Sequence, residues 1–464
     1  MVFDEVASLF RIRGSSKSDA GRYVALNRIF SCLKQLPVWF FLLSTESKIE
    51  KILPPDIPIP GDHQDLDSTN QSSARIAFGD SDEKLRVFPP FVAFPLDIED
   101  QRRMRDKATR KAELVKLMVE FSEPSHMATF GRRLWCVYSN ANRLFDVAKF
   151  KVIGGNNVYN PLNNHHVFAV LSFRLALDTC VETTISLPLL RTAVGSYMRV
   201  VISVDQRTGF LCTTTPSEPI LANAAMMHLC KRPGNWLFSI TTLSRELLQQ
   251  GLIEKGLKGE LFSRVLLILA HDSLRGVPGL AVIPTFTVKD FLLALYASNH
   301  HELVENIDDQ ILQAGMNFTH FTSTNEDLLP GEPTISLCHD LLRRCAALQL
   351  SQDNPAFDQL IPIYFGDGES PFDRSKCGAI VIQNKNKGAA TTPDYIFDEE
   401  FDKIDPRVRA GKANKQDPIR QRKTYAFIGM NCPILFLLFD LGTKPGSSPP
   451  VQVSRTTDSG RPPL

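Results

Sequence analysis

Residues 357–388 constrain the fold more than any other part of this 464-residue chain. They read FDQLIPIYFGDGESPFDRSKCGAIVIQNKNKG, which is two apolar runs joined by a polar connection. The runs 359–365 and 379–382 have the length and composition of buried strands. Their closeness in sequence predicts that the two strands pair as a hairpin.

Three polar side chains flank these predicted strands. Asp358 comes directly before the first strand, and Gln383 and Lys385 follow the apolar part of the second. Because side chains alternate along a strand, Gln383 and Lys385 are expected on one face, within reach of Asp358. Carboxylate and amide oxygens suit a hard cation such as Mg²⁺. A lysine beside them could orient a water or stabilise the charge of a phosphorane.

This arrangement resembles the core of the PD-(D/E)xK, or restriction-endonuclease-like, nuclease superfamily. In that superfamily an Asp starts one strand and (D/E/Q)-x-K ends the next, with a further acid on an upstream helix. The resemblance implies catalytic roles for Asp358, Gln383, Lys385 and Glu260, the last in the run GLKGELFSRVLLILAHD. It also implies that Glu260, Asp358 and Gln383 hold the metal. The alternative is an ordinary hairpin with a solvated polar end, with Glu260 paired to Arg264 on a helix surface.

A second resemblance lies in the first 60 residues. An apolar stub ends at Asp4 and Glu5, helical spacing covers 22–36, and an apolar run ends at Ser44 and Thr45. This order resembles the Walker B to sensor-1 part of a P-loop ATPase, in which the acids hold Mg²⁺ and the hydroxyl senses the γ-phosphate. The chain has no G-x-x-x-x-G-K-[ST] motif, so we expect no nucleotide binding through a P-loop. The alternative for the two acids is a solvated chain end.

Short motifs elsewhere extend this resemblance. They are PPF after residue 88, FGRRLW at 130–135, PSEPILA at 216–222 and NFTHF at 317–321. Together with the first 60 residues they resemble fungal Crinkler-like proteins, in which a P-loop ATPase module is fused to a PD-(D/E)xK-like module. The resemblance implies a truncated ATPase half, with Arg132 and Arg133 in a lid or winged-helix region. The alternative is that these arginines pair with local acids.

The predicted fold class is α/β, in five parts. Residues 1–60 form the P-loop-ATPase-like remnant, and 61–87 form a flexible loop. Residues 88–245 form a mixed α/β region resembling a lid, a winged helix or a linker. Residues 250–441 form a restriction-endonuclease-like mixed sheet flanked by helices. The Pro/Ser-rich residues 442–464 form a disordered tail.

Several local elements follow from the residue pattern. Helices are expected at 142–151, 162–177, 222–231, 240–255, 288–297 and 336–350, the last leading directly to the hairpin. The apolar run at 433–440 would be the fourth strand of the sheet. Pro362 removes a backbone donor, which favours an edge strand or a bulge. His320 is expected to be a hydrogen-bonded histidine and not a metal ligand.

Composition limits the partners and the compartment. The formal net charge is +1, so any nucleic-acid surface must be local. One basic run is a candidate for such a surface, with a solvated loop as the alternative: Lys403, Arg407, Arg409, Lys412, Lys415, Arg420, Arg422 and Lys423. Nine cysteines without a C-x-x-C pair predict free thiols in a reducing compartment, cytoplasmic or nuclear. We find neither a signal peptide nor an apolar run long enough for a membrane helix.

Three functions therefore remain open from the sequence. The first is a metal-dependent nuclease that acts through the D…QxK site. The second is a non-catalytic remnant or protein-interaction module of a Crinkler-like protein that has lost its ATPase half. The third is a partner-binding regulatory protein of unrelated fold. The first requires Glu260, Asp358, Gln383 and Lys385 to converge at one end of a sheet.

Overall fold

The computed structural model describes the segments 2–3, 41–42, 118–177, 179, 186–204, 211–249, 258–274, 285–323, 334–350, 357–368, 370–385, 434–440 and 451–455. The chain divides into two compact units: Met1–Phe94 with Thr179–Thr214, and Pro95–Asp178 with Thr215–Leu464. Helices and strands both occur, so the fold is mixed α/β, as predicted. None of the described helices has the length and apolar character needed to span a membrane.

In the first unit, two short strands from the N-terminal region pair in parallel. They are β1 (Val2–Phe3) and β2 (Phe41–Leu42), with Val2 opposite Phe41. These strands come from the two apolar runs that end at Asp4 and Glu5 and at Ser44 and Thr45. The helix predicted at 22–36 to connect them lies outside the described residues.

The first unit also contains a helix and a hairpin from the middle of the chain. Helix α7 (Ser186–Ser196) precedes the antiparallel strands β3 (Val200–Val204) and β4 (Leu211–Thr214). These elements fall inside the predicted 88–245 region, yet they group with the N-terminal residues. That region is therefore divided between the two units.

The second unit is built on a mixed sheet. Its strands are β5 (Phe286–Thr287), β6 (Gly315–Met316), β7 (His320–Ser323), β8 (Ala346–Gln349), β9 (Gln359–Tyr364), β10 (Cys377–Lys385), β11 (Ile434–Asp440) and β12 (Val451–Arg455). The order is β12-β11-β10-β9-β6-β5, with β8 also beside β9 and β7 beside β8. Strands β8, β9 and β10 run antiparallel in turn, whereas β11 runs parallel to β10. The predicted strands near 359–365, 379–382 and 433–440 therefore share one sheet.

Strand β9 is central, although it contains Pro362. Along its whole length it pairs with β10, where Pro362 lies opposite Ala379. On its other side it pairs first with β8, through Gln359 and Leu360, and then with β6, through Tyr364. The proline therefore lies where β9 changes partner, a position that tolerates a missing donor better than a continuous ladder does.

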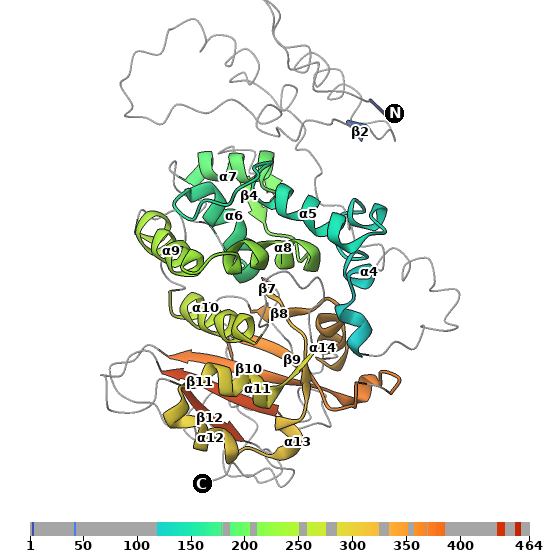
Figure 1. Ribbon diagram of the computed structural model, residues 1–464, viewed down its shortest axis with the longest axis vertical. Helices are drawn as coiled ribbons and strands as arrows, with labels where there is room; N and C mark the ends of the chain where they lie inside the picture. The colour runs from blue at the N-terminus through green and yellow to red at the C-terminus, as the bar shows by residue number, and fades with distance from the viewer. Residues whose placement is uncertain are drawn as a thin grey trace, which may run out of the picture. The chain divides into compact units, whose positions relative to one another are not determined.

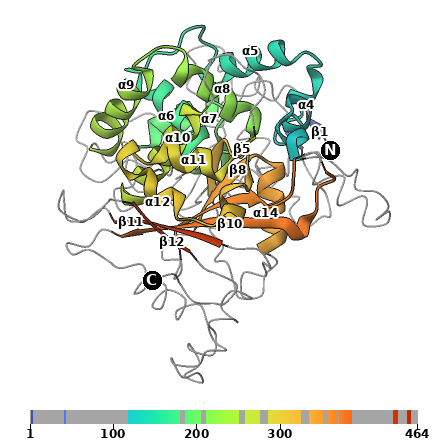
Figure 2. The same ribbon diagram turned by 60° about the horizontal axis from the view of Figure 1, so that its bottom comes forward.

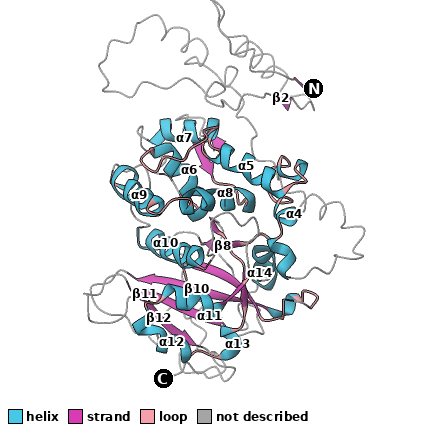
Figure 3. Cartoon of the chain, viewed as in Figure 1, coloured by secondary structure: helices cyan, strands magenta, loops and turns pink. Residues whose placement is uncertain are grey.

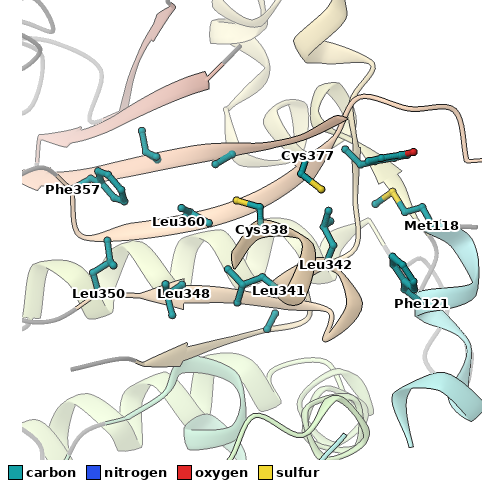
Figure 4. Close-up of a cluster of buried hydrophobic side chains, with 14 residues drawn as sticks. Met118, Phe121, Cys338, Leu341, Leu342, Leu348, Leu350, Phe357, Leu360 and Cys377 are labelled. Atoms are coloured by element: carbon teal, nitrogen blue, oxygen red, sulfur yellow. The ribbon is translucent and has the colours of Figure 1, made fainter. Parts of the chain in front are cut away.

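One face of the sheet packs on helix α14 (Thr334–Arg343). The side chains of Leu341 and Leu342 from the helix pack with Leu360 and Val381 from the strands in a buried apolar cluster (Figure 4). Burying each leucine stabilises the fold by about 1.5–3 kcal/mol. This cluster fixes the register of the central strands, since a slip of one residue would turn these side chains to the other face.

The helix predicted at 336–350 is shorter than the sequence suggests, which corrects that prediction. It ends at Arg343, Cys345 has a positive φ of 50°, and Ala346–Gln349 forms the buried strand β8. The physical reason is the tertiary pairing of residues 346–349 with two other strands. This run lies between β7 and β9, so its backbone groups bond to two neighbouring strands.

The opposite face of the sheet packs on α10 (Lys258–Ser273) and α11 (Val288–Leu295). Figures 1 and 2 both show these two helices together beside the strands. Buried isoleucines at 361, 363, 380 and 382 alternate with the residues of the α14 face. The sheet is thus covered on both sides, which matches its near-continuous apolar strands.

A group of helices completes the second unit: α5 (Ala141–Val152), α6 (Asn164–Leu175), α8 (Pro219–Cys230) and α9 (Asn235–Thr242) (Figure 3). Asn140 and Asn163 cap the first two with their side-chain oxygens. Helix α6 is buried on all sides and contacts α8, α10 and strand β7. The helices predicted near 142–151, 162–177 and 222–231 are therefore confirmed, within a few residues at each end.

The FGRRLW and PSEPILA motifs meet at the buried carboxylate of Glu218. Trp135 donates its indole N–H to Glu218 Oε2 at 2.5 Å, and the Arg132 guanidinium forms an ion pair with Glu218 Oε1. Gly131 has a φ of +79°, and a Cβ atom there would lie 2.2 Å from Glu218 Cγ. Arg132 therefore pairs with a local acid, which is the structural alternative considered for it.

The NFTHF motif joins the same region. His320 Nε2 lies 2.8 Å from Ser217 Oγ, and its Nδ1 lies 2.9 Å from Thr319 Oγ1. Burial, together with the nearby cations Arg174 and Arg344, lowers the pKa of His320 from 6.5 to about 3. The prediction that His320 is a hydrogen-bonded histidine is confirmed.

Part of the predicted disordered tail is ordered. Within 442–464, Val451–Arg455 forms β12, which pairs antiparallel with β11. The pairing covers a long apolar edge that β11 would otherwise present, and sheets commonly protect such edges.

Candidate functional site

Asp358 stands at the entrance to β9, and both of its main-chain groups are hydrogen-bonded. Its N–H donates to Ile382 O at 2.8 Å, and its carbonyl accepts from Leu350 N at 2.9 Å. The carboxylate is partly buried and accepts from Asn384 N at 2.6 Å and Asn384 Nδ2 at 3.1 Å. The acid is therefore held against the end of β10, as the hairpin prediction requires.

Gln383 lies beside this carboxylate. Its Nε2 lies 3.4 and 3.5 Å from the two oxygens of Asp358, and the side chain is only 6% exposed. Strand alternation places it on the face of Val381, which packs on α14. The structure therefore brings together the acid and the amide that the sequence singled out.

Glu260 reaches the same sheet end from the opposite face. It lies in the first turn of α10, and its Oε2 accepts from Gln349 Nε2 at 2.6 Å. Gln349 Nε2 is also 3.2 Å from the carbonyl of Asp358. The side-chain amide of Gln349 thus lies between the Glu260 carboxylate and the Asp358 carbonyl and contacts both.

Arg264 is not a surface partner of Glu260, which corrects the alternative of a surface pair. Its side chain is 2% exposed, and its guanidinium donates to the carbonyls of Leu175 and Ala176. The reason is the apolar environment of this side of α10, which packs against α6. Arg264 therefore joins two helices.

Lys385 is the last residue of β10 and lies opposite Asp440 in the parallel pairing with β11. Its main chain is thus at the sheet end that carries Asp358 and Gln383. Its side chain is outside the described part of the structure. The predicted role of its ammonium group stays a prediction.

The site is rich in amide oxygens suited to a hard cation. Beside the Asp358 carboxylate, the buried amide oxygens of Gln383 and Asn384 have no hydrogen-bond partner within the described segments. Buried acceptors of this kind are normally paired, so these two fit a cation or another donor. The described residues contain no cluster of three or more His, Cys, Asp or Glu placed for a metal. A metal here would therefore be held by two carboxylates and amide oxygens, which suits Mg²⁺ better than zinc.

The other residues predicted from the sequence lie outside the described residues. These are Asp4, Glu5, Ser44 and Thr45 of the ATPase-like remnant, and the basic run from Lys403 to Lys423. Their roles stay predictions.

The sequence pattern does not identify two residues of the site, Gln349 and Asn384. The sequence pattern places Gln349 in a helix that continues to Leu350, and it gives Asn384 only as the middle residue of Gln-x-Lys. The double arginine before Cys345, followed by the apolar run from Ala346, is the signal that could have revealed a strand ending at Gln349. Asn384 could be recognised only from the register of the hairpin.

Comparison with known proteins adds one match. The family model described as Domain of unknown function (DUF8736) matches residues 156–401, which is more than half of the chain. The matched part runs from before α6 to beyond β10 and includes Glu260, Asp358, Gln383 and Lys385. Neither the curated proteins nor the solved structures gave a match.

Proposed function

We propose that this chain, which belongs to the family described as Domain of unknown function (DUF8736), is a metal-dependent nuclease. The observation that carries the proposal is the contact between the Asp358 carboxylate, before β9, and Gln383, near the end of β10. Glu260 and the main chain of Lys385 lie at the same end of the sheet. A cleavage site of the D…QxK type needs these residues together.

The order of the strands supports the restriction-endonuclease-like fold. Strands β8, β9 and β10 form an antiparallel meander, and β11 joins β10 in parallel. The helix that carries Glu260 precedes them and contacts β10. A helix, a three-strand meander and a parallel fourth strand suit the core that the resemblance implies.

In this proposal each residue of the site has a separate role in binding the metal or positioning the water. Mg²⁺ bound there would supply a Lewis acid for the phosphodiester and lower the pKa of a bound water. Asp358 would supply the negative charge that retains the ion, and Glu260 would ligate it directly or through water. A half-turn of the Gln383 amide about its last side-chain bond brings Oε1 to the side of Asp358. Lys385 would position the attacking water.

The substrate in this proposal is a nucleic acid. The basic run between Lys403 and Lys423 would neutralise its phosphates, because it follows the site closely in sequence. We further propose that the chain is Crinkler-like, with the first unit derived from a P-loop ATPase. The parallel pairing of β1 with β2 supports this origin. No nucleotide is expected to bind.

One observation favours a second candidate function, a non-catalytic interaction module. The Asp358 carboxylate accepts hydrogen bonds from both the main chain and the side chain of Asn384. Bonds of this kind would tie β9 to β10 without any chemistry. In this second case the site residues stabilise the hairpin only.

Cleavage of DNA and RNA by the full chain, with Mg²⁺ or Mn²⁺, tests the proposal. Asp358→Asn and Lys385→Ala should each lower the rate by roughly 10²–10³ or more, since each removes a preorganised charge. Asp367→Asn is the matched control. This acid lies exposed between β9 and β10, where its carboxylate accepts from Ser370.

Three outcomes separate the candidate functions. Loss of cleavage in both site variants, with wild-type rates in Asp367→Asn, supports the nuclease. Cleavage that persists in Lys385→Ala rules out this site. A wild-type protein that neither cleaves nor binds Mn²⁺ favours the interaction module.

A further inference from the structure

Gln349 occupies a junction that no sequence motif marks. It is the last residue of β8, and its side chain is 3% exposed. Its Nε2 lies 2.6 Å from Glu260 Oε2, 3.2 Å from Asp358 O and 3.3 Å from Leu350 O. One amide nitrogen therefore faces a carboxylate and two main-chain carbonyls.

The orientation of this amide group is fixed by its surroundings. All three neighbouring atoms are acceptors, and only the nitrogen end of the amide can donate to them. Reversing the amide would place Oε1 against the Glu260 carboxylate, an arrangement of two acceptors without a proton between them. Gln349 therefore holds the carboxylate of Glu260 in one position.

The same amide acts on Asp358 through its main chain. The carbonyl of Asp358 accepts from Leu350 N at 2.9 Å as well as from Gln349. Its N–H donates to Ile382 O at 2.8 Å. With both peptide groups held, the direction in which the Asp358 side chain leaves the backbone is set.

Gln359 provides a natural comparison. It lies directly opposite Gln349 in the pairing of β8 with β9 and is fully buried. Its Nε2 donates to the main-chain carbonyl of Glu260 at 2.9 Å and lies 2.8 Å from Ser263 Oγ. Gln359 thus fastens the backbone of α10 to the sheet, whereas Gln349 contacts the carboxylate itself.

We infer that Gln349 is a positioning residue for the cation site, because it holds the Glu260 carboxylate and the Asp358 main chain in a single arrangement. This inference rests on the proposed nuclease function. Gln349 acts through these two acids and does not touch the substrate. Residues that orient metal ligands in this way change metal affinity or activity by about 10–100-fold when replaced.

Gln349→Met and Gln359→Met, made in the full chain, test the inference. Both remove one amide of equal size from neighbouring buried positions, so their effects on folding should be similar. Calorimetric titration with Mn²⁺ should give a dissociation constant about 10–100-fold higher in Gln349→Met. The Gln359→Met protein should stay near the wild-type value. In DNA cleavage, kcat should fall in Gln349→Met while KM for DNA stays unchanged.

The results distinguish failure of the inference from failure of the proposed function. Wild-type protein that binds no Mn²⁺ overturns both. Wild-type protein that binds Mn²⁺, with equal affinities in the two variants, overturns the inference alone and leaves Gln349 a merely structural residue. If a methionine variant does not fold, as judged by circular dichroism, the pair Gln349→Leu and Gln359→Leu is compared by the same measurements.

Discussion

Replacing His320 with Gln should remove one acid-sensitive contribution to the stability of the second unit. In the folded protein, burial lowers the pKa of this imidazole to about 3, and Arg174 and Arg344 act in the same direction. In the unfolded chain the pKa returns to its usual value of about 6.5. The unfolded state therefore binds a proton between these two values, and the folded state does not.

The sign and size of the effect follow from this difference. Because the unfolded state takes up the proton, the free energy of unfolding falls as the pH falls below about 6.5. A pH of 5 lies about 1.5 units below the pKa of the unfolded imidazole. The free energy of unfolding is therefore lower by about 2 kcal/mol at this pH. This loss should be nearly absent at pH 7.5. Below pH 5 the free energy of unfolding continues to fall until the pH approaches 3, where the folded state also binds the proton.

Urea unfolding followed by tryptophan fluorescence, at pH 7.5 and pH 5, measures the effect. Between these pH values the wild type should lose about 2 kcal/mol more than His320→Gln, since glutamine cannot take up the proton. Other histidines with lowered pKa, such as His228, contribute equally to both proteins and cancel. His300→Gln, at a partly exposed position, controls for the loss of a histidine. Equal pH dependence in wild type and His320→Gln would refute the reasoning.

Three further predictions follow from the packing and the site. Gln383→Glu places a second negative charge 3.4 Å from Asp358, so the melting temperature without divalent cations should fall. Mg²⁺ should then raise the melting temperature more than it does in wild type, and an unchanged response to Mg²⁺ would contradict a cation site here. Leu342→Ala opens a cavity in the fully buried cluster on α14 and should cost about 2–5 kcal/mol in urea unfolding; a loss below 1 kcal/mol would show that the cluster collapses around it. Glu218→Gln removes the charge that pairs with Arg132 and should cost about 1–3 kcal/mol by the same assay, and an unaltered midpoint would remove the structural role assigned to this pair.

The parts of the site that the sequence revealed are those that lie close together along the chain. Asp358 and Gln383 belong to one hairpin, so the lengths of the two strands place them side by side. Strand alternation needs no knowledge of distant elements. Glu260 was found only through the resemblance to a nuclease family. Its connection to Asp358 depends on Gln349, and that residue lies on a strand the sequence did not indicate.

The strand β8 was missed because its residues suit two structures. The run that follows α14 continues the apolar spacing of the helix, and alanine and leucine favour helices. Only the pairing with β7 and β9 makes the strand more stable than the helix for this run, and those partners come from other parts of the chain. The motifs around Glu218 and His320 were likewise recognised only as short resemblances. Their meaning is structural, since they meet across about 100 residues of sequence.

The parallel pairing of β10 with β11 has a consequence for synthesis of the chain on the ribosome. The hairpin of β9 and β10 is complete at Lys385, but its partner β11 begins only at Ile434. At about 5–20 residues per second, translation of the intervening stretch takes several seconds. During that interval the apolar edge of β10 is available to other nascent chains, and unpaired edges of this kind promote aggregation. Slower translation of residues 386–433 should therefore lower the yield of folded protein, and a chaperone that binds extended apolar segments should restore it.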